Sequence, residues 1–166
     1  MSFSFRRLNS GDAATWQSLR LEGVRNFPLG FLVTEKEALG MNVARAQSVL
    51  SAGAMRGVFQ DDKLIGFCGY RPEHLARTRH RAELGPFYVS SHFHGSGAAD
   101  TLMNGVIHEA RSAEIDRLEL LVDTENFRAI RFYERHGFKK TATHFDGVRI
   151  DGQSRDDYFY HLHIAT

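Results

Sequence analysis

Hydrophobic residues in the first third of the chain recur at spacings typical of short strands and amphipathic helices. Alternation of apolar and polar residues over Ser2–Leu8 predicts a strand. Ser10–Asp12 is expected to cap a first helix, and Asn26–Gly30 to form a loop. Thr34–Glu37 has the spacing of a capping box that opens a second helix. The apolar stripes predicted for these two helices are Trp16, Leu19 and Gly23, and then Leu39, Val43, Ala46 and Leu50.

The middle of the chain has the pattern of consecutive strands. Met55–Gln60 and Lys63–Tyr70 are apolar runs separated by Asp61-Asp62, which predicts a hairpin. Arg81–Val89 is expected to be a third strand. Because Gly85-Pro86 interrupts it and proline has no backbone N–H group, we expect a bulge or a lost hydrogen bond there.

The last part of the chain alternates between helix and strand patterns. A loop over Ser90–Gly97 precedes a helix, Arg117–Val122 is a short buried strand, and Asn126 opens a helix that ends at His136-Gly137. The stripe predicted for the helix after the loop is Ala99, Leu102, Met103, Val106 and Ala110. The two final strands and the turn-rich segment between them are Phe138–Thr143, Tyr158–Ile164 and Asp146–Arg155. This order predicts an α+β (mixed α/β) fold in which helices cover a mixed sheet.

Composition narrows the possible classes of protein. The 166 residues contain no repeat or linker, so we expect one domain over 1–166. Lys and Arg number 21 against 20 Asp and Glu, which argues against a nucleic-acid partner, and no apolar run is long enough to span a membrane. Cys68 is the single cysteine and lies in an apolar stretch, where a buried, inert thiol is expected. One cysteine and no secretory signal favour a reducing compartment, the cytoplasm.

The loop before the third predicted helix has the composition of an anion-binding site. Gly95 and Gly97 permit positive φ and a close approach of the backbone to a ligand, and the N–H groups that open the helix favour a phosphate. The segment lacks the third glycine of the dinucleotide-binding fingerprint and the Gly-Lys-Ser/Thr of a P-loop. Ser96 is not in a Gly-x-Ser-x-Gly elbow, so a phosphate contact is a simpler role for it than nucleophilic attack.

A second motif follows in the next helix, where Asn126 and Tyr133 are seven residues apart and so share one face. Together the two motifs resemble the GNAT superfamily of acetyl-CoA-dependent N-acetyltransferases. The Arg/Gln-x-x-Gly-x-Gly/Ala loop of that family matches His94–Ala99. Its Asn-x-x-Ala-x-x-x-Tyr-x-x-x-Gly-Phe signature is met by Asn126, Ala129, Tyr133, Gly137 and Phe138.

The resemblance implies a fold and a cofactor site. The fold would be a mostly antiparallel, twisted sheet of about seven strands with a splayed parallel pair in its middle and about four helices on its faces. Acetyl-CoA would be the co-substrate. Its pantetheine arm would pair with the backbone of Phe87, Tyr88 and Val89 and contact Asn126. The pyrophosphate would bind the amides of His94, Gly95, Ser96, Gly97, Ala98 and Ala99. His94 stands where Arg or Gln is usual, so weaker or more pH-dependent binding is expected.

The resemblance also implies catalytic roles. A neutral amine would attack the thioester directly, and Tyr133 would act as the general acid for the departing thiolate, beside Asn126. Glu83 is the first candidate for the base and Asp123 the second, although a water chain could relay the proton instead.

In the resembled family, the acceptor site lies between the loop after the first helix and the final hairpin. Phe27 and Phe31 would supply an apolar wall, and Asp123 would face the acceptor. Four carboxylates against two arginines in the hairpin could attract a cationic amine: Asp146, Asp151, Asp156 and Asp157, with Arg149 and Arg155. The expected acceptor is a primary amine of a small molecule. The alternatives are a protein N-terminus or lysine, or a regulatory module that binds acyl-CoA without chemistry; the chain would be a monomer or a homodimer.

Nine histidines raise the question of a metal site. His92 and His94 form one His-x-His pair, and His161 and His163 form another. A zinc site normally needs three or four ligands at known spacings, and neither Cys-x-x-Cys nor His-Glu-x-x-His occurs. We therefore expect no metal.

Overall fold

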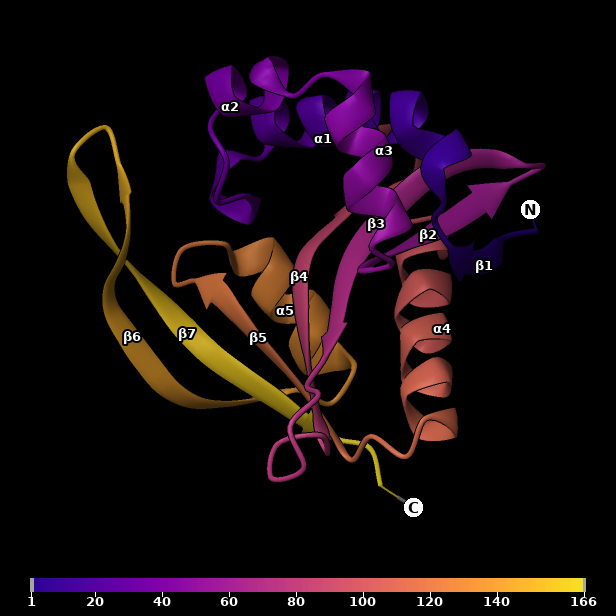
Figure 1. Cartoon of the computed structure of the whole chain (residues 1–166). Coiled ribbons are helices and arrows are strands. Elements are labelled where there is room, and N and C mark those ends of the chain that lie inside the picture. Colours follow the sequence, from indigo (N-terminus) through magenta and orange to yellow (C-terminus); the bar gives the residue numbers. More distant parts are fainter. Residues whose placement is uncertain (1, 166) are drawn as a thin grey trace.

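The protein is described by a computed structural model that covers residues 2–165. Seven strands form one sheet in the order β1-β2-β3-β4-β5-β7-β6 (Figure 1). Every neighbouring pair is antiparallel except β4 and β5, which are parallel. The strands are β1 Ser4–Arg7, β2 Met55–Gln60, β3 Lys63–Pro72, β4 Arg81–Val89, β5 Arg117–Asp123, β6 Lys139–Ile150 and β7 Gln153–His163.

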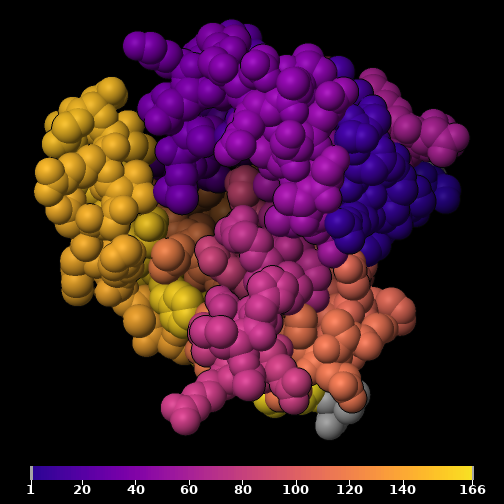
Figure 2. Space-filling view, in the orientation of Figure 1, coloured from indigo at the N-terminus to yellow at the C-terminus, as the bar shows by residue number. Residues whose placement is uncertain are grey.

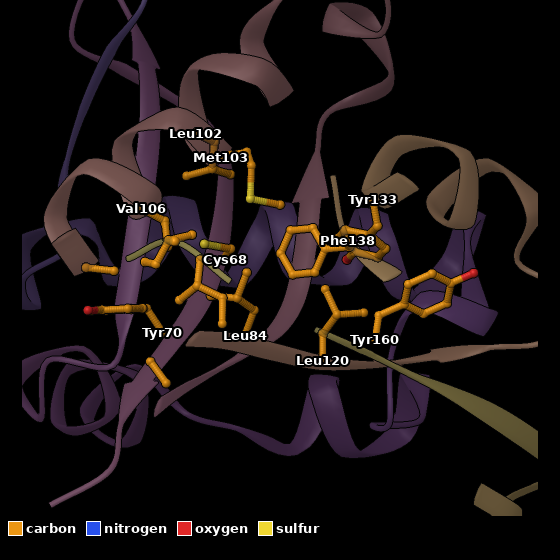
Figure 3. Close-up of a cluster of buried hydrophobic side chains, with 14 of the residues drawn as sticks. Cys68, Tyr70, Leu84, Leu102, Met103, Val106, Leu120, Tyr133, Phe138 and Tyr160 are labelled. Carbon is orange, nitrogen blue, oxygen red and sulfur yellow. The ribbon is translucent and has the colours of Figure 1, made fainter. Parts of the chain in front are cut away.

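Helices cover both faces of this sheet and bury two separate clusters of apolar side chains. They are α1 Ala13–Asn26, α2 Glu35–Gly40, α3 Val43–Ser51, α4 Ala98–Ser112 and α5 Phe127–Arg135. The larger cluster lies between the sheet and α4 and α5, and includes Leu102, Leu120 and Tyr133 (Figure 3). The second cluster, around Trp16 and Phe67, lies under α1 and α3. This arrangement confirms the predicted fold class.

The parallel pair is joined over only three residues at its start. Arg81–Glu83 pairs with Arg117–Glu119, and beyond that the two strands separate. On the other edge of β4, Cys68 pairs with Phe87 and Gly69 with Gly85, so Pro86 is the extra residue of a bulge. The bulge expected at Gly85-Pro86 is confirmed. It increases the local twist of β4 at the point where β4 leaves β5.

The prediction of one long helix after Thr34 is wrong, because the structure has two. Thr34 and Glu37 form the expected capping box, but α2 ends at Gly40 and the side chain of Asn42 caps α3 by accepting a hydrogen bond from the N–H group of Arg45 at 2.8 Å. Glycine and an N-cap asparagine favour this break. The break takes Leu39 and Val43 out of the buried stripe, and their exposed fractions are 59% and 51%.

The final hairpin is longer than predicted. Most of Asp146–Arg155, expected to be rich in turns, belongs to β6 and β7, and the connection is the two-residue turn Asp151-Gly152. Both residues have positive φ, which is the conformation of a tight Asp-Gly hairpin turn. The hairpin extends beyond the rest of the sheet toward α2 (Figure 1), and in the space-filling view it stands beside the helical segment across a hollow (Figure 2).

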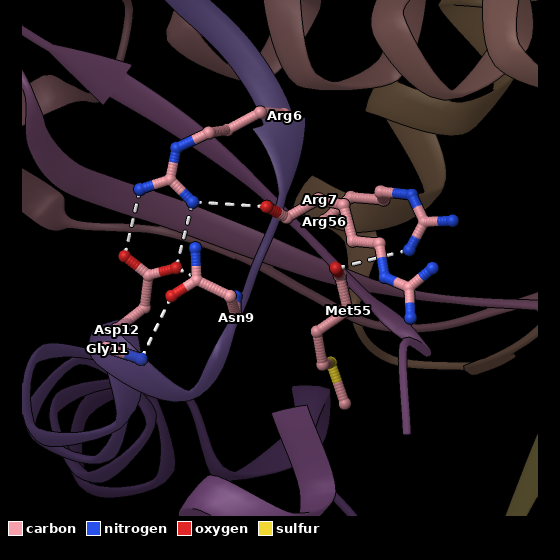
Figure 4. A network of polar contacts seen from close by, with 7 residues as sticks. All are labelled: Arg6, Arg7, Asn9, Gly11, Asp12, Met55 and Arg56. Atoms are coloured by element: carbon pink, nitrogen blue, oxygen red, sulfur yellow. Dashed lines mark hydrogen bonds and ion pairs between the residues drawn. The ribbon is translucent and has the colours of Figure 1, made fainter. Parts of the chain in front are cut away.

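The segment Ser10–Asp12 precedes the first helix as predicted, but it forms a 3-10 turn of its own. Asp12 is the N-cap residue of α1 and makes no side-chain capping bond there. Asn9 caps the turn by accepting a hydrogen bond from the N–H group of Gly11, and Asp12 accepts from the N–H group of Asn9. Arg6 on β1 donates two hydrogen bonds to Asp12, at 2.8 and 2.9 Å (Figure 4). The hydrogen bonds from Arg6 lower the pKa of Asp12, so the carboxylate stays ionised and ties β1 to α1.

Candidate active site

The loop between β4 and α4 has the backbone geometry of an anion-binding turn. Gly95 and Gly97 have φ of +75° and +92°, and a Cβ added to either would meet no atom within 4 Å. The N–H group of Ser96 donates to the carbonyl of Phe93, and that of Ala98 to the hydroxyl of Ser96. Within residues 2–165 the N–H groups of Gly97 and Ala99 have no such partner, so they are free for a ligand.

A cavity of about 600 Å³ lies beside this loop. Nine of the residues predicted to bind the cofactor line it: Phe87, Tyr88, Val89, His94, Gly95, Gly97, Ala99, Asn126 and Tyr133. Ser96 and Ala98 do not, because their polar groups are used inside the loop. The cavity also contains three arginines of α5: Arg128, Arg131 and Arg135. Open glycines, free amides and a row of guanidinium groups fit the pyrophosphate and phosphates of coenzyme A.

His94 turns toward β4. Its Nε2 donates to the carbonyl oxygen of Val89 at 2.8 Å, since a carbonyl can only accept. Burial lowers the pKa of His94, so the imidazole is neutral at pH 7. Its ring lies 5.6 Å from the Phe27 ring, over which the Arg128 guanidinium sits at 5.7 Å. The fixed cation at this end of the cavity is therefore Arg128 rather than His94.

The two residues of the second motif lie where the splayed strands separate. Asn126 is the N-cap of α5, and its Oδ1 accepts from the N–H group of Ala129 at 3.3 Å, which leaves its Nδ2 group as a donor. Tyr133 is 9% exposed, and burial raises the pKa of its hydroxyl. The hydroxyl makes no hydrogen bond to the described residues 2–165. A protonated hydroxyl is thus present at the junction of the strands.

A second cavity, of about 390 Å³, lies on the opposite side of the splay, the region where β4 and β5 separate. It is bounded by the segment from α1 to α2, the ends of β4 and β5, and the β6–β7 hairpin. The residues that line both cavities are Gly30, Phe31, Phe87, Asn126, Ala129 and Tyr133. Tyr133 therefore lies where the two cavities meet.

Three carboxylates line this second cavity in different electrostatic settings. Glu83 forms an ion pair with Arg71 at 3.2 Å and is half-exposed. Asp123 accepts two hydrogen bonds from Arg155, at 2.6 and 2.8 Å. Burial alone would raise the pKa of Asp123, but the hydrogen bonds from Arg155 and Glu125 outweigh it and lower the pKa. A carboxylate held this way is a weak proton acceptor. Asp157, by contrast, has no arginine partner among residues 2–165, and burial raises its pKa.

The expected acceptor residues divide between the two cavities. Phe31 lines both, Asp123 lines the second, and Phe27 lines only the cofactor side. Sequence reasoning missed Glu22, whose carboxylate accepts from the Tyr88 hydroxyl at 2.7 Å and the Ser90 hydroxyl at 3.0 Å, and so fastens α1 to the end of β4. No local motif marks Glu22, because its partners lie more than 60 positions away.

The family model described as "Acetyltransferase (GNAT) family" matches residues 18–138 of this chain. The chain belongs to this family. Among its relatives, a probable spermine N(1)-acetyltransferase of Bacillus subtilis subsp. natto is 30% identical over 99 residues, which are 57% of this chain and 65% of that protein. The match to an uncharacterized N-acetyltransferase of Mycobacterium bovis spans 46% of this chain and 47% of that one. The chain thus spans about half to two thirds of these relatives.

Solved structures share the GNAT fold. A probable acetyltransferase from Staphylococcus epidermidis superposes with a TM-score of 0.83 at 21% identity, covering 99% of this chain and all of that one. A GNAT superfamily phosphinothricin acetyltransferase from Sinorhizobium meliloti, in complex with acetyl-CoA, gives 0.81 at 14% identity over 98% and 89% of the two chains. Across residues 2–165, no helix is long and apolar enough to cross a membrane, and no group of three His, Cys, Asp or Glu side chains could hold a metal.

Proposed function

We propose that this chain transfers the acetyl group of acetyl-CoA to a primary amine of a small molecule. The observation that carries the proposal is the junction at Tyr133. One cavity, with free amides and arginines, suits coenzyme A, and the other, with carboxylates and apolar walls, suits an amine. The two share lining residues where β4 and β5 separate, among them Phe87 and Tyr133, so the donor and the acceptor would approach each other there.

The residues around the junction would have separate roles in binding acetyl-CoA and in polarising its thioester. Bound acetyl-CoA supplies an acetyl thioester. Gly97 and Ala99 would bind its pyrophosphate through their N–H groups, and the backbone of β4 would pair with the pantetheine arm as an added strand does. A backbone N–H group of β4 would polarise the thioester carbonyl. Asn126 would donate from Nδ2 toward the pantetheine.

Tyr133 would donate the proton that the departing sulfur needs. The acceptor ammonium loses one proton to become a neutral nucleophile, and its nitrogen loses a second as the C–N bond forms and the C–S bond breaks. Tyr133 gives one proton to sulfur and regains one, so the products are an amide, a thiol and one free proton. The raised pKa of Tyr133 keeps its proton in place until the thiolate forms.

The size and position of the second cavity favour a small acceptor. A volume of about 390 Å³, walled by the hairpin on one side and the α1–α2 segment on the other, matches a small molecule better than a folded protein surface. A relative named as a probable spermine N(1)-acetyltransferase is consistent with an amine acceptor.

The test is release of the CoA thiol from acetyl-CoA over a panel of amines, with the acetylated product identified by mass spectrometry. We expect at least one small primary amine to accelerate release well above the rate in buffer. Tight binding of acetyl-CoA with no acceleration by any amine would instead support a module that binds acyl-CoA without chemistry. Acceleration only by peptides would support a protein acceptor.

A further inference from the structure

Asp157 is a buried carboxylate without a counter-charge in the second cavity. Its exposed fraction is 8%, and it lines the cavity. Its side chain makes neither a hydrogen bond nor an ion pair with any residue between 2 and 165, in contrast to Glu83 and Asp123 on the same cavity. Because burial of an unpaired charge is costly, a cation that entered the cavity and paired with Asp157 would gain binding energy from this carboxylate.

The strand register puts Asp157 on the acceptor side of the splay. It is paired with Asp123, the last residue of β5, and with His144 of β6. Side chains at paired positions of neighbouring strands lie on the same face of a sheet. Asp157 therefore faces the same side as Asp123, at the end of the splayed strand.

The charges around Asp157 do not neutralise it. Burial is the main cause that raises the pKa of Asp157, and the carboxylates of Asp123 and Asp156 add to it. His144 and Arg155 act in the opposite direction, but the Arg155 guanidinium is engaged by Asp123 and Glu125. A carboxylate with a raised pKa is also a better proton acceptor at neutral pH than one held by arginine.

We infer that Asp157 binds the ammonium group of the acceptor, and that the acceptor is a monoamine with an apolar body. This inference rests on the proposed function. The apolar part of the cavity is formed by Phe31, Leu32, Val33, Met41, Val148 and Ile150. Arg20, which has no ion-pair partner among residues 2–165, lines the same cavity, so a further ammonium group, as in a polyamine, would meet a like charge there.

Binding can be measured without turnover because Trp16, the single tryptophan, lines this cavity. Phenethylamine, 2-phenylethanol and spermine are titrated while Trp16 fluorescence is followed. We expect the wild-type protein to bind phenethylamine about tenfold more tightly than the alcohol, as one charge-assisted contact provides. The Asp157→Asn variant should bind the amine and the alcohol with affinities within about twofold of each other, because it lacks the carboxylate charge. Equal binding of amine and alcohol by the wild type, or a retained preference in Asp157→Asn, overturns the inference.

Asp151→Asn is the matched control. Although the sequence placed Asp151 among the acidic residues of the hairpin, it lies in the exposed turn and does not line the cavity, and asparagine also accepts its positive φ. It should keep the wild-type preference. Asp157→Ser is a second variant, to be used if the first does not fold. Spermine should bind more weakly than phenethylamine, and tighter binding of spermine would contradict the monoamine class.

Acetyl transfer measured on the same proteins separates this inference from the proposed function. Amine binding that depends on Asp157 without any acetyl transfer supports the binding site and rejects the proposed function. Acetyl transfer to phenethylamine with the same kcat/KM in Asp157→Asn as in the wild type rejects the role of Asp157 and keeps the function.

Discussion

The cofactor side and the acceptor side of the splay are built in opposite ways. On the cofactor side, most lining residues come from two short segments, and the loop presents backbone groups, the N–H groups of Gly97 and Ala99. On the acceptor side, side chains from α1, β4, β5 and both strands of the hairpin meet although they lie far apart in the sequence. The first side is therefore built mostly from two local sequence motifs, while the second side is assembled from segments that only the fold brings together.

The largest effect is expected where the two sides meet. Tyr133→Phe removes the proposed proton donor, so kcat should fall about hundredfold while the affinity for acetyl-CoA changes less than about twofold. Steady-state kinetics measure kcat, and calorimetric titration measures the affinity for acetyl-CoA. Tyr158→Phe, the same change at a tyrosine that lines neither cavity, should leave kcat unaltered. Unchanged turnover in Tyr133→Phe would remove Tyr133 from the mechanism.

The next effect concerns stability on the acceptor side. Asp123→Asn breaks the double hydrogen bond with Arg155, which joins β5 to β7, and should lower the free energy of unfolding by about 2 kcal/mol. The pKa of Asp123 is lowered in the folded state, so its contribution is present above the unfolded pKa. The difference from wild type should therefore shrink as pH falls below about 4. A difference that persists unchanged at pH 3 in urea unfolding would contradict the ion pair.

A smaller effect is expected on the cofactor side alone. Gly97 has φ of +92° at the start of α4, where alanine adds about 1–2 kcal/mol of strain. Gly97→Ala should raise the dissociation constant of acetyl-CoA about tenfold. Gly40→Ala is the control, because its Cβ would meet no atom within 4 Å and its φ is not positive. Equal affinity in the two variants would show that the loop does not set the binding energy.

The smallest effect concerns His94. Because burial lowers the pKa of His94, its charge should not change between pH 7 and 8.5. Acetyl-CoA affinity, measured by calorimetry, should then vary less than about twofold over this range. A tenfold loss of acetyl-CoA affinity over this range would instead support the pH-dependent binding that the sequence suggested for a histidine at this position.

The same contrast explains which features the sequence could predict. The phosphate-binding loop and the Asn126–Tyr133 helix are local patterns, and the bulge at Gly85-Pro86 follows from the missing N–H group of proline. The break at Gly40 was missed because the apolar spacing continues through it, although Leu39 and Val43 face outward. The pairing of each carboxylate could not be predicted from the sequence either. Asp123 is bound by Arg155, 32 residues away in the sequence, while Asp157 has no side-chain partner among residues 2–165. Neither fact follows from the spacing of residues along the chain.

The most direct test of the separation between the two sides is two-substrate kinetics with acetyl-CoA and phenethylamine for Gly97→Ala and Asp157→Asn. We expect Gly97→Ala to raise the KM of acetyl-CoA about tenfold and leave the KM of the amine unchanged. Asp157→Asn should raise the KM of the amine and leave that of acetyl-CoA unchanged. Asp157→Asn raising the KM of acetyl-CoA, or Gly97→Ala raising that of the amine, would contradict two separate cavities that meet at Tyr133.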